Sequence, residues 1–317
     1  MKHILNKNDV EINIKKALKI LKNGDLVIFP TETVYGLGGN ATNGNAINKI
    51  YKIKNRPINN PLICHFKNIE NIEKNFFLND IAYKLAEKFW PGPLTLVLEK
   101  KDSSTISTKL SNQQKFVGCR IPNHPIALKL LSGIPFPIAA PSANISTKLS
   151  STKIIHLSQK LKDNIFILDG GKTFFGLEST IINASNNNPK ILRLGSITLE
   201  VIEKIIPNIV LENYSNFSNL SPGQQIKHYS PNLPLRINVN SVLKDEALLN
   251  FGTNDLKSEI MNLNLSTSGN LEEAGKNLYD YLHILDNSQS IGIAVAPVPN
   301  HSLGKTINDR LTRASKS

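Results

Sequence analysis

The chain has 317 residues, 40% of them hydrophobic and 20% charged, which is enough apolar material for two packed domains and excludes bulk disorder. No run of about 18 apolar residues occurs, and the first residues do not resemble a secretion signal, so we expect a cytoplasmic protein with no membrane association. The formal charge of +12 indicates polyanionic ligands, either nucleotide phosphates or RNA.

The first predicted element is a helix over residues 11–23, where apolar residues recur at helical spacing until Gly24 ends the pattern. A continuous apolar run at 26–29 predicts a buried strand. Similar runs predict strands at 62–66, 94–98, 116–121, 138–140, 166–168, 180–182 and 191–194. Helical patterns lie between several of them, at 43–54, 80–89 and 124–132. This order predicts an α/β domain on a twisted, mixed sheet with flanking helices.

The periodic pattern fails between 208 and 234, where Asn, Ser, Pro, Gln and Tyr dominate, and this composition predicts a linker. After it, strands are predicted at 235–239 and 291–298, and helices at 242–250 and 271–285. We therefore divide the chain into an α/β domain at 1–207, a linker at 208–234 and a small α/β domain at 235–317.

The two cysteines, Cys64 and Cys119, are too few for a disulfide framework or a four-thiolate zinc site, and we predict that both are buried and reduced. The seven histidines are scattered and no carboxylate cluster accompanies them, so no protein-built metal site is predicted. A Mg²⁺ ion that arrives with a nucleotide needs few protein ligands and leaves no such pattern in a sequence.

Small polar residues gather where the predicted strands end, and such ends border the ligand crevice in open α/β sheets. The segments are Pro30–Gly38, Lys54–Pro57, Arg120–Pro122, Ala140–Asn144 and Glu178–Thr180. Two glycine-rich stretches are rejected as standard phosphate loops. Phe166 stands where a P-loop ending at Thr173 needs its first glycine, and Gly36–Gly39 lacks the third spaced glycine of a dinucleotide fingerprint.

Arginine is rare in this chain, at six of the 37 basic residues. A guanidinium holds a carboxylate or a phosphate with two parallel hydrogen bonds, which a lysine ammonium cannot do. Arg56, Arg120 and Arg193 lie in the strand-end segments or in a predicted strand. Any one of them could form a surface ion pair instead, but all three together favour a site for anionic ligands.

These motifs resemble the YrdC-like domain that defines the threonylcarbamoyl-AMP synthase family. The residues that carry this resemblance are Pro30–Gly38, Lys54, Arg56 and Pro57 with Pro61 and Leu62, Ser142–Asn144, and Glu178–Thr180. Further segments resemble the linker and the C-terminal domain of the long, two-domain form of this family. They are Ser221–Gly223, His228–Pro231, Leu271–Ala274 and Ile307–Leu311. The resemblance implies a YrdC-like catalytic domain, a linker that covers the active site, and a small Rossmann-like C-terminal domain.

The resemblance implies an L-threonylcarbamoyladenylate synthase, a nucleotidyltransferase that serves a tRNA modification. L-Threonine takes up bicarbonate to give a carbamate, the carbamate attacks the α-phosphate of ATP, and pyrophosphate leaves. No protein nucleophile is needed, so positioning and charge neutralisation carry the catalysis. Mg²⁺ is implied as the companion of ATP. The implied partners are the downstream tRNA threonylcarbamoyl transferase machinery and, through weak contact, RNA.

The resemblance also implies roles for single residues. Lys54 and Arg56 are the expected catalytic residues, because they hold the ATP phosphates. The threonine site is expected to contain Thr33, His65, Arg120, Ala140 and Ser179, with Arg120 gripping the threonine carboxylate. The ATP site is expected to contain Arg56, Asn60, Ser142, Asn144, Ser150, Arg193, His228 and Tyr229, the last two closing its mouth. His65 on an apolar strand and Ser150 in a loop also have ordinary structural explanations.

Two other functions stay open at this stage. The positive charge also fits a non-catalytic RNA-binding module of the same fold, although the chain lacks interleaved aromatic and basic residues. A related activity on carbamoyl-adenylate serves hydrogenase maturation, and the zinc-finger and acylphosphatase-like segments that accompany it are absent here.

Overall fold

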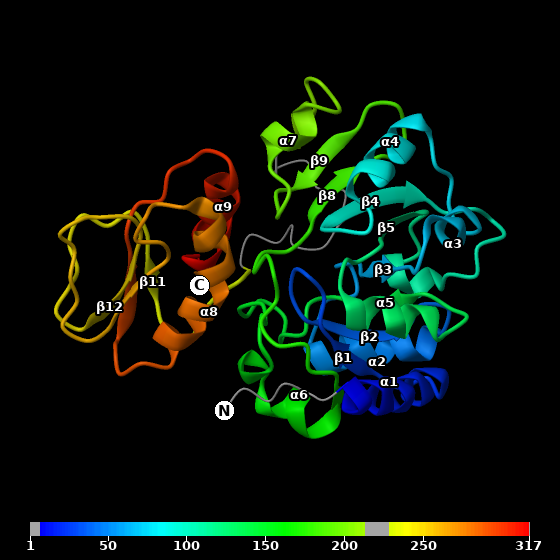
Figure 1. The fold of residues 1–317 in the computed structure, drawn as a ribbon, viewed down its shortest axis with the longest axis horizontal. Helices are drawn as coiled ribbons and strands as arrows, with labels where there is room; N and C mark the ends of the chain where they lie inside the picture. The colour runs from blue at the N-terminus through cyan, green and yellow to red at the C-terminus, as the bar shows by residue number, and fades with distance from the viewer. Residues whose placement is uncertain (1–6, 213–227, 317) are drawn as a thin grey trace.

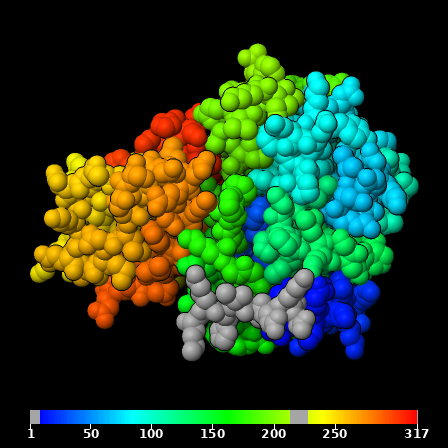
Figure 2. All heavy atoms as spheres, in the orientation of Figure 1, coloured from blue at the N-terminus to red at the C-terminus, as the bar shows by residue number. Residues whose placement is uncertain are grey.

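The computed structural model describes residues 7–212 and 228–316, and these residues form two lobes, each built on its own sheet (Figure 1). The predicted linker motif at Ser221–Gly223 lies outside the described residues. In Figure 2 the smaller lobe, coloured yellow to red, packs against green segments of the larger one. Within the described residues, no helix is long and apolar enough to cross a membrane.

The larger lobe contains a ten-stranded sheet in the order β10-β9-β8-β4-β5-β3-β6-β2-β1-β7. It mixes parallel pairs such as β3 with β5 and antiparallel pairs such as β4 with β5, as the sequence predicted. The strands are β1 (Val27–Phe29), β2 (Gly36–Asn40), β3 (Ile63–His65), β4 (Leu94–Glu99), β5 (Phe116–Arg120), β6 (Ile138–Ala139), β7 (Phe166–Ile167), β8 (Thr180–Asn183), β9 (Lys190–Arg193) and β10 (Val210–Leu211). The helices are α1 (Lys7–Lys22), α2 (Gly44–Lys54), α3 (Ile69–Glu73), α4 (Asp80–Phe89), α5 (Pro125–Ser132), α6 (Gln159–Asn164) and α7 (Leu199–Glu203).

Every strand and helix that the sequence predicted in the first domain is present in the structure. The sequence did not predict β2 or β10. Strand β10 pairs with β9, so the sheet extends to Leu211, four residues past the predicted end of the domain at 207. The domain limits stay a prediction.

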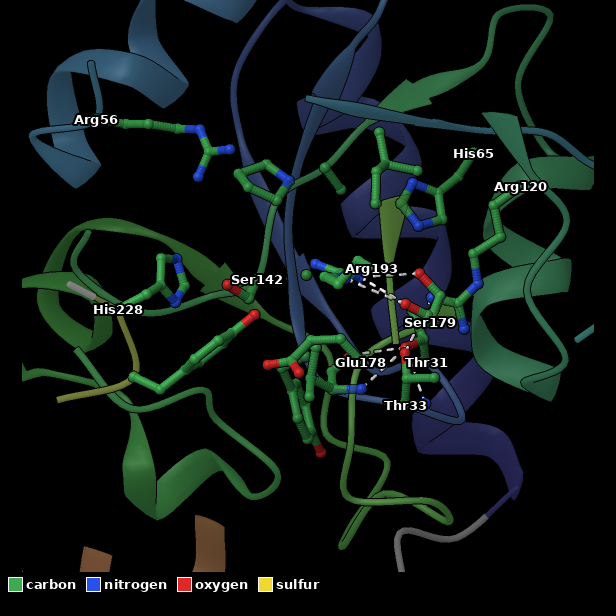
Figure 3. Close-up of a pocket in the computed structure, with 17 residues that line it drawn as sticks. Thr31, Thr33, Arg56, His65, Arg120, Ser142, Glu178, Ser179, Arg193 and His228 are labelled. Carbon is green, nitrogen blue, oxygen red and sulfur yellow. Dashed lines mark hydrogen bonds between the residues drawn. The ribbon is translucent and has the colours of Figure 1, made fainter. Parts of the chain in front are cut away.

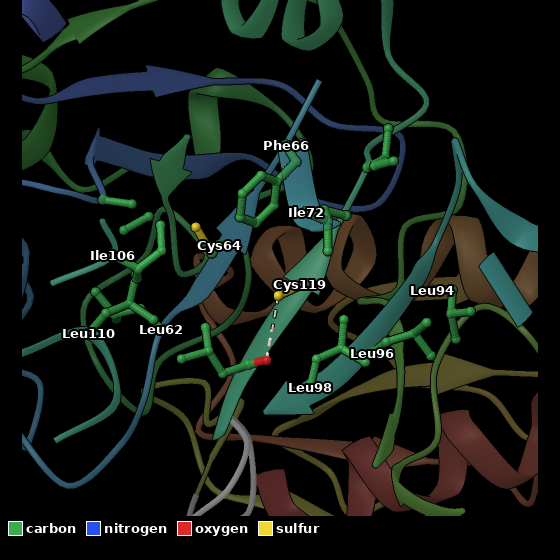
Figure 4. Close-up of a cluster of buried hydrophobic side chains, with 14 of the residues drawn as sticks. Leu62, Cys64, Phe66, Ile72, Leu94, Leu96, Leu98, Ile106, Leu110 and Cys119 are labelled. Atoms are coloured by element: carbon green, nitrogen blue, oxygen red, sulfur yellow. Dashed lines mark hydrogen bonds between the residues drawn. The ribbon is translucent and has the colours of Figure 1, made fainter. Parts of the chain in front are cut away.

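The prediction of two buried thiols is confirmed (Figure 4). Cys64 on β3 lies opposite Cys119 on β5 in the parallel pair, inside the main hydrophobic core with neighbours such as Leu62 and Phe66. Burial raises the pKa of both thiols well above the ordinary value, which keeps them protonated and unreactive.

The smaller lobe contains a four-stranded parallel sheet in the order β11-β14-β12-β13. Its strands are β11 (Leu235–Arg236), β12 (Glu246–Asn250), β13 (Asn262–Asn264) and β14 (Gly292–Val295), and its helices are α8 (Leu271–Asp286) and α9 (Leu303–Ala314). Both helices lie on the side of this sheet that faces the larger lobe (Figure 1). The C-terminal domain therefore presents helix side chains, not strand edges, to its neighbour.

One sequence prediction in this lobe is wrong. The segment 242–250 was predicted to be a helix, but its second half forms strand β12 at the centre of the sheet. Ala247, Leu248 and Leu249 are each fully buried, because a central parallel strand is covered on both faces. A short, continuous apolar run has no periodicity that separates such a strand from a buried helix.

Candidate active site

A narrow cavity of about 50 Å³ lies where several strands of the large sheet end (Figure 3). Arg56 and His228 lie on one side of it in Figure 3, and His65 and Arg120 on the other. Its lining residues are Thr31, Thr33, Val34, Tyr35, Gly36, Arg56, Ile63, His65, Arg120, Ala140, Pro141, Ser142, Glu178, Ser179, Arg193, His228 and Tyr229. All five residues predicted for the threonine site are in this set.

Arg120 is held in the cavity by three protein oxygens. It ends strand β5, it is 3% exposed, and its Nη2 forms an ion pair with Glu32 Oε1 at 2.6 Å. Its Nη1 donates to Thr33 Oγ1 at 3.0 Å and its Nε to the Gly92 carbonyl at 3.2 Å. A guanidinium has five N–H groups, so one on each Nη has no partner among the described residues. Those two groups can hold a ligand carboxylate.

His65 ends strand β3 beside Arg120, and its ring packs edge-on against Phe29 at 6.0 Å between ring centroids. Burial, and then the charge of Arg120, lower the pKa of His65 to about 3. The imidazole is therefore neutral at physiological pH. Its Nδ1 is buried and has no hydrogen-bond partner within the described chain.

Ser179 and Arg193 lie between the two sides in Figure 3. Arg193, at the end of β9, donates from Nη2 to the Ser179 carbonyl at 2.8 Å and to its hydroxyl at 3.2 Å. The same hydroxyl lies 2.8 Å from Thr95 Oγ1. The arginine therefore fixes both the backbone and the side chain of Ser179.

Arg56 supplies a second guanidinium across the cavity. It follows helix α2, and its Nε and Nη2 donate to the Asn60 carbonyl at 2.9 Å, to Asn60 Oδ1 and to the Pro61 carbonyl at 2.8 Å. Its Nη1 has no partner within the described residues. Burial lowers the pKa of Arg56 to about 10, so the side chain stays charged at neutral pH.

Four of the residues predicted for ATP or catalysis stand behind the lining. Asn60 holds Arg56, and Ser150 Oγ donates to Glu178 Oε1 at 2.6 Å. The amide of Asn144 donates to the Lys148 carbonyl at 2.7 Å, and Lys54 Nζ donates to backbone carbonyls. Each contacts a lining residue or the loop that carries one, so none of them reaches the cavity directly in this structure.

Unpartnered polar atoms mark the cavity as a ligand site. Buried donors and acceptors are nearly always hydrogen-bonded, because leaving one unpaired costs about 1–3 kcal/mol. His65 Nδ1, His228 Nδ1 and Tyr229 Oη all line this one cavity and have no partner within residues 7–212 and 228–316. A polar ligand would satisfy them.

Tyr229 carries a second sign of function, because its φ of 63° is a left-handed conformation that is strained for a bulky side chain. It is 1% exposed and is held from the C-terminal domain. The guanidinium carbon of Arg310 lies 4.9 Å from its ring centroid, and the Tyr279 ring lies at 5.8 Å. The surrounding contacts stabilise the strained backbone over the cavity.

Sequence reasoning missed the residues that support the site from the C-terminal domain. Glu178 lines the cavity and accepts from Tyr279 Oη at 2.9 Å and from Arg310 Nε at 2.9 Å. Burial alone would raise the pKa of Glu178, but Arg310, Arg193 and Ser150 together lower it to about 2. The rarity of arginine could have identified Arg310, which is 1% exposed.

Comparisons with known proteins agree with this architecture. A family model described as Telomere recombination matches residues 19–195, and one described as Threonylcarbamoyl-AMP synthase, C-terminal domain, matches residues 197–316. The threonylcarbamoyl-AMP synthase of Bacillus subtilis is 36% identical over 98% of this chain and 94% of its own length. The chain belongs to the threonylcarbamoyl-AMP synthase family.

Further relatives place both lobes in this family. The threonylcarbamoyl-AMP synthase of Pyrococcus abyssi is 36% identical over 96% of this chain and 94% of its own length. The crystal structure of P. abyssi Sua5 complexed with L-threonine matches with a TM-score of 0.87 at 35% identity, covering 96% of this chain and 94% of that one. The two-domain synthase architecture expected from the sequence is confirmed.

Proposed function

We propose that this protein is an L-threonylcarbamoyladenylate synthase that makes threonylcarbamoyl-AMP from L-threonine, bicarbonate and ATP. The threonine amine and bicarbonate form a carbamate with loss of water. A carbamate oxygen then forms a bond to the α-phosphorus of ATP while the bond from that phosphorus to the pyrophosphate breaks. The near full-length identity to proteins named threonylcarbamoyl-AMP synthase supports this reaction.

The observation that carries the proposal is the pair of guanidinium groups that face one cavity from two sides. Arg120 keeps one N–H on each Nη without a protein partner in the described chain, which matches the two oxygens of the threonine carboxylate. The Nη1 of Arg56 has no protein partner in the described chain and can donate to the triphosphate. Both arginines are held rigidly by protein oxygens, so they need no reorganisation when charge develops in the reaction.

The remaining residues orient the reactants and exclude water. The neutral imidazole of His65 adds no charge beside Arg120, so it can accept or donate a hydrogen bond to threonine without repelling its ammonium group. The cavity is smaller than the roughly 300–1,000 Å³ of a typical ligand pocket. ATP therefore enters by displacing the His228–Tyr229 end of the linker, which then covers the labile carbamate.

In this proposal Mg²⁺ comes with ATP as part of the substrate. Such an ion is coordinated chiefly by phosphates and water and needs few protein ligands. In the same proposal the protein is cytoplasmic, and its product passes to a tRNA threonylcarbamoyl transferase.

The test is release of pyrophosphate by the purified protein with ATP and Mg²⁺. The proposal predicts release only when L-threonine and bicarbonate are both present, because the attacking oxygen comes from the carbamate. L-Serine and L-valine are matched controls that lack the methyl or the hydroxyl group of threonine. Release that is equally fast without threonine would contradict the proposal.

A further inference from the structure

Lys54 directs its charged group toward backbone and not into the cavity. It is the last residue of helix α2 and is 1% exposed. Its Nζ donates to the carbonyl oxygen of Ser142 at 2.5 Å and to that of Asn144. The next residue, Asn55, has a left-handed φ of 50° and caps the helix through its backbone N–H, which fixes the point where the Lys54 side chain departs.

The two carbonyls belong to the loop that carries the Ser142 hydroxyl into the cavity. This loop is bound to the end of α2 a second time, because the Ser146 N–H donates to the Lys54 carbonyl at 3.0 Å. Within the loop the Ser142 hydroxyl donates to Asn144 Oδ1, and the Asn144 amide donates to the Lys148 carbonyl. The position of Ser142 therefore depends on contacts that meet at Lys54.

The energetics favour an amino group that stays in this place. Burial, and then the charge of Arg56, lower the pKa of Lys54 well below its ordinary value. A buried polar group is costly unless its N–H groups are hydrogen-bonded, and the two carbonyls accept from two of them. Lys54 Nζ would have to break both bonds and leave the loop unsupported in order to reach a phosphate in the cavity. Arg56, two residues later, already presents an uncommitted Nη1 there.

We propose that Lys54 is a positioning residue, which fixes the Ser142–Asn144 loop for nucleotide binding and does not contact the ATP phosphates itself. This inference rests on the proposed function, because it takes ATP as the ligand that the loop serves. Of Lys54 and Arg56, only Arg56 then contacts the triphosphate through its charge.

A double-mutant cycle on ATP binding, measured by calorimetry without threonine, separates the two roles. Lys54→Met should weaken ATP binding about tenfold or more, as expected for the loss of charge-assisted hydrogen bonds. Adding Ser142→Ala to Lys54→Met should not weaken ATP binding further, because the Ser142 hydroxyl is already misplaced in the single variant. In the control cycle, Arg56→Met and Ser142→Ala should weaken binding independently, so that their fold-changes multiply.

Two further measurements distinguish positioning from general damage. L-Threonine affinity should fall much less than ATP affinity in Lys54→Met, because four of the five predicted threonine residues, all but Ala140, lie outside the Ala140–Asn144 segment. The Lys54→Gln variant should bind ATP better than Lys54→Met, since the glutamine amide can still donate to a carbonyl. If Lys54→Met does not fold, Lys54→Gln takes its place in the double-mutant cycle.

Three outcomes would overturn the inference: unchanged ATP affinity in Lys54→Met, fold-changes of Lys54→Met and Ser142→Ala that multiply, or a parallel loss of threonine affinity. Wild-type protein that binds no ATP would instead overturn the proposed function, and this inference with it.

Discussion

The arginines around the cavity differ in which residues they contact and in whether they line the cavity, and these differences separate their roles. Arg120 and Arg56 each keep N–H groups without a partner in the described chain, while Arg193 holds Ser179 in place. Arg310 does not line the cavity, and it donates to Glu178, Asp309 and the Leu194 carbonyl. The first two are suited to bind ligands, and the other two support the residues around them.

Replacing Arg120 with lysine tests the role of its guanidinium. Arg120→Lys keeps the positive charge but loses the paired donors, so the KM for L-threonine should rise at least about tenfold while the KM for ATP changes little. Steady-state pyrophosphate release measures both constants. Arg236→Lys is the matched control, because Arg236 pairs with Glu246, neither residue lines the cavity, and both constants should stay unchanged. An unaltered threonine KM in Arg120→Lys would contradict the role.

Two buried histidines predict how stability depends on pH. Burial lowers the pKa of His65 and of His228 to about 3, whereas an unfolded histidine titrates near 6.5. Between these values the unfolded chain binds more protons, so stability falls as the pH falls below about 6.5, by up to about 1.4 kcal/mol per pH unit for each histidine. The melting temperature should therefore drop between pH 7 and pH 5. The melting temperature of the His65→Gln variant should drop less over this range. An equal drop in the wild-type protein and the variant would contradict this account.

At the scale of elements, strand β2 shows what local sequence patterns cannot reveal. Its residues Gly36–Asn40 are mostly glycine, which is disfavoured in strands, and the sequence predicted only a polar loop segment there. A Cβ added at Gly38 would lie 2.6 Å from a Phe29 ring carbon and 2.8 Å from an Ile138 methyl. The neighbouring strands β1 and β6 supply the apolar cover for β2, so tertiary packing determines this strand.

Substitution of Gly38 tests this explanation. Gly38→Ala should destabilise the protein by about 1–3 kcal/mol through overpacking and should raise the threonine KM, because the Phe29 ring, which must shift, packs against His65. Gly118→Ala is the matched control in a buried strand, where the new Cβ would meet its nearest neighbour at 3.1 Å. Denaturant unfolding measures both variants. Equal stability losses would mean that the Phe29 contact has no special role.

Most of the sheet could be predicted from the sequence, and so could five residues that line one cavity, whose role in threonine binding stays a prediction. Apolar runs such as 94–98 mark buried strands directly, and Thr33, His65, Arg120, Ala140 and Ser179 meet in one cavity although their order in the chain gives no distances. The sequence could not separate lining residues from those behind them. Lys54 and Ser150 have side chains that often bind ligands, but in this structure they donate their hydrogen bonds to protein oxygens.

At the scale of the whole molecule, the C-terminal domain is built into the active site. Helices α8 and α9 bring Tyr279 and Arg310 to Glu178, and Thr306 Oγ1 donates to the Gly195 carbonyl at 3.0 Å. Glu178 in turn holds Ser150 and lines the cavity. Undocking of the two lobes would therefore remove the Tyr279 and Arg310 partners of Glu178.

Breaking this contact tests the coupling between the lobes. Arg310→Met leaves the buried Glu178 without its ion-pair partner, which should cost about 3–5 kcal/mol of stability and most of the activity. The double variant Arg310→Met, Glu178→Gln removes the unpaired charge and should recover part of the stability. Thermal unfolding of the two variants measures this. A double variant that is less stable than Arg310→Met alone would contradict the proposed cause.

The central claim is that one cavity brings L-threonine, bicarbonate and ATP together for a single reaction. Incubation with ¹³C-labelled bicarbonate, L-threonine and MgATP, followed by mass spectrometry, tests it most directly. The account predicts a threonylcarbamoyl-adenylate that carries one ¹³C atom and that disappears when threonine is omitted or Arg120 is replaced by alanine. Consumption of ATP without any labelled adenylate in the wild-type reaction would contradict the account.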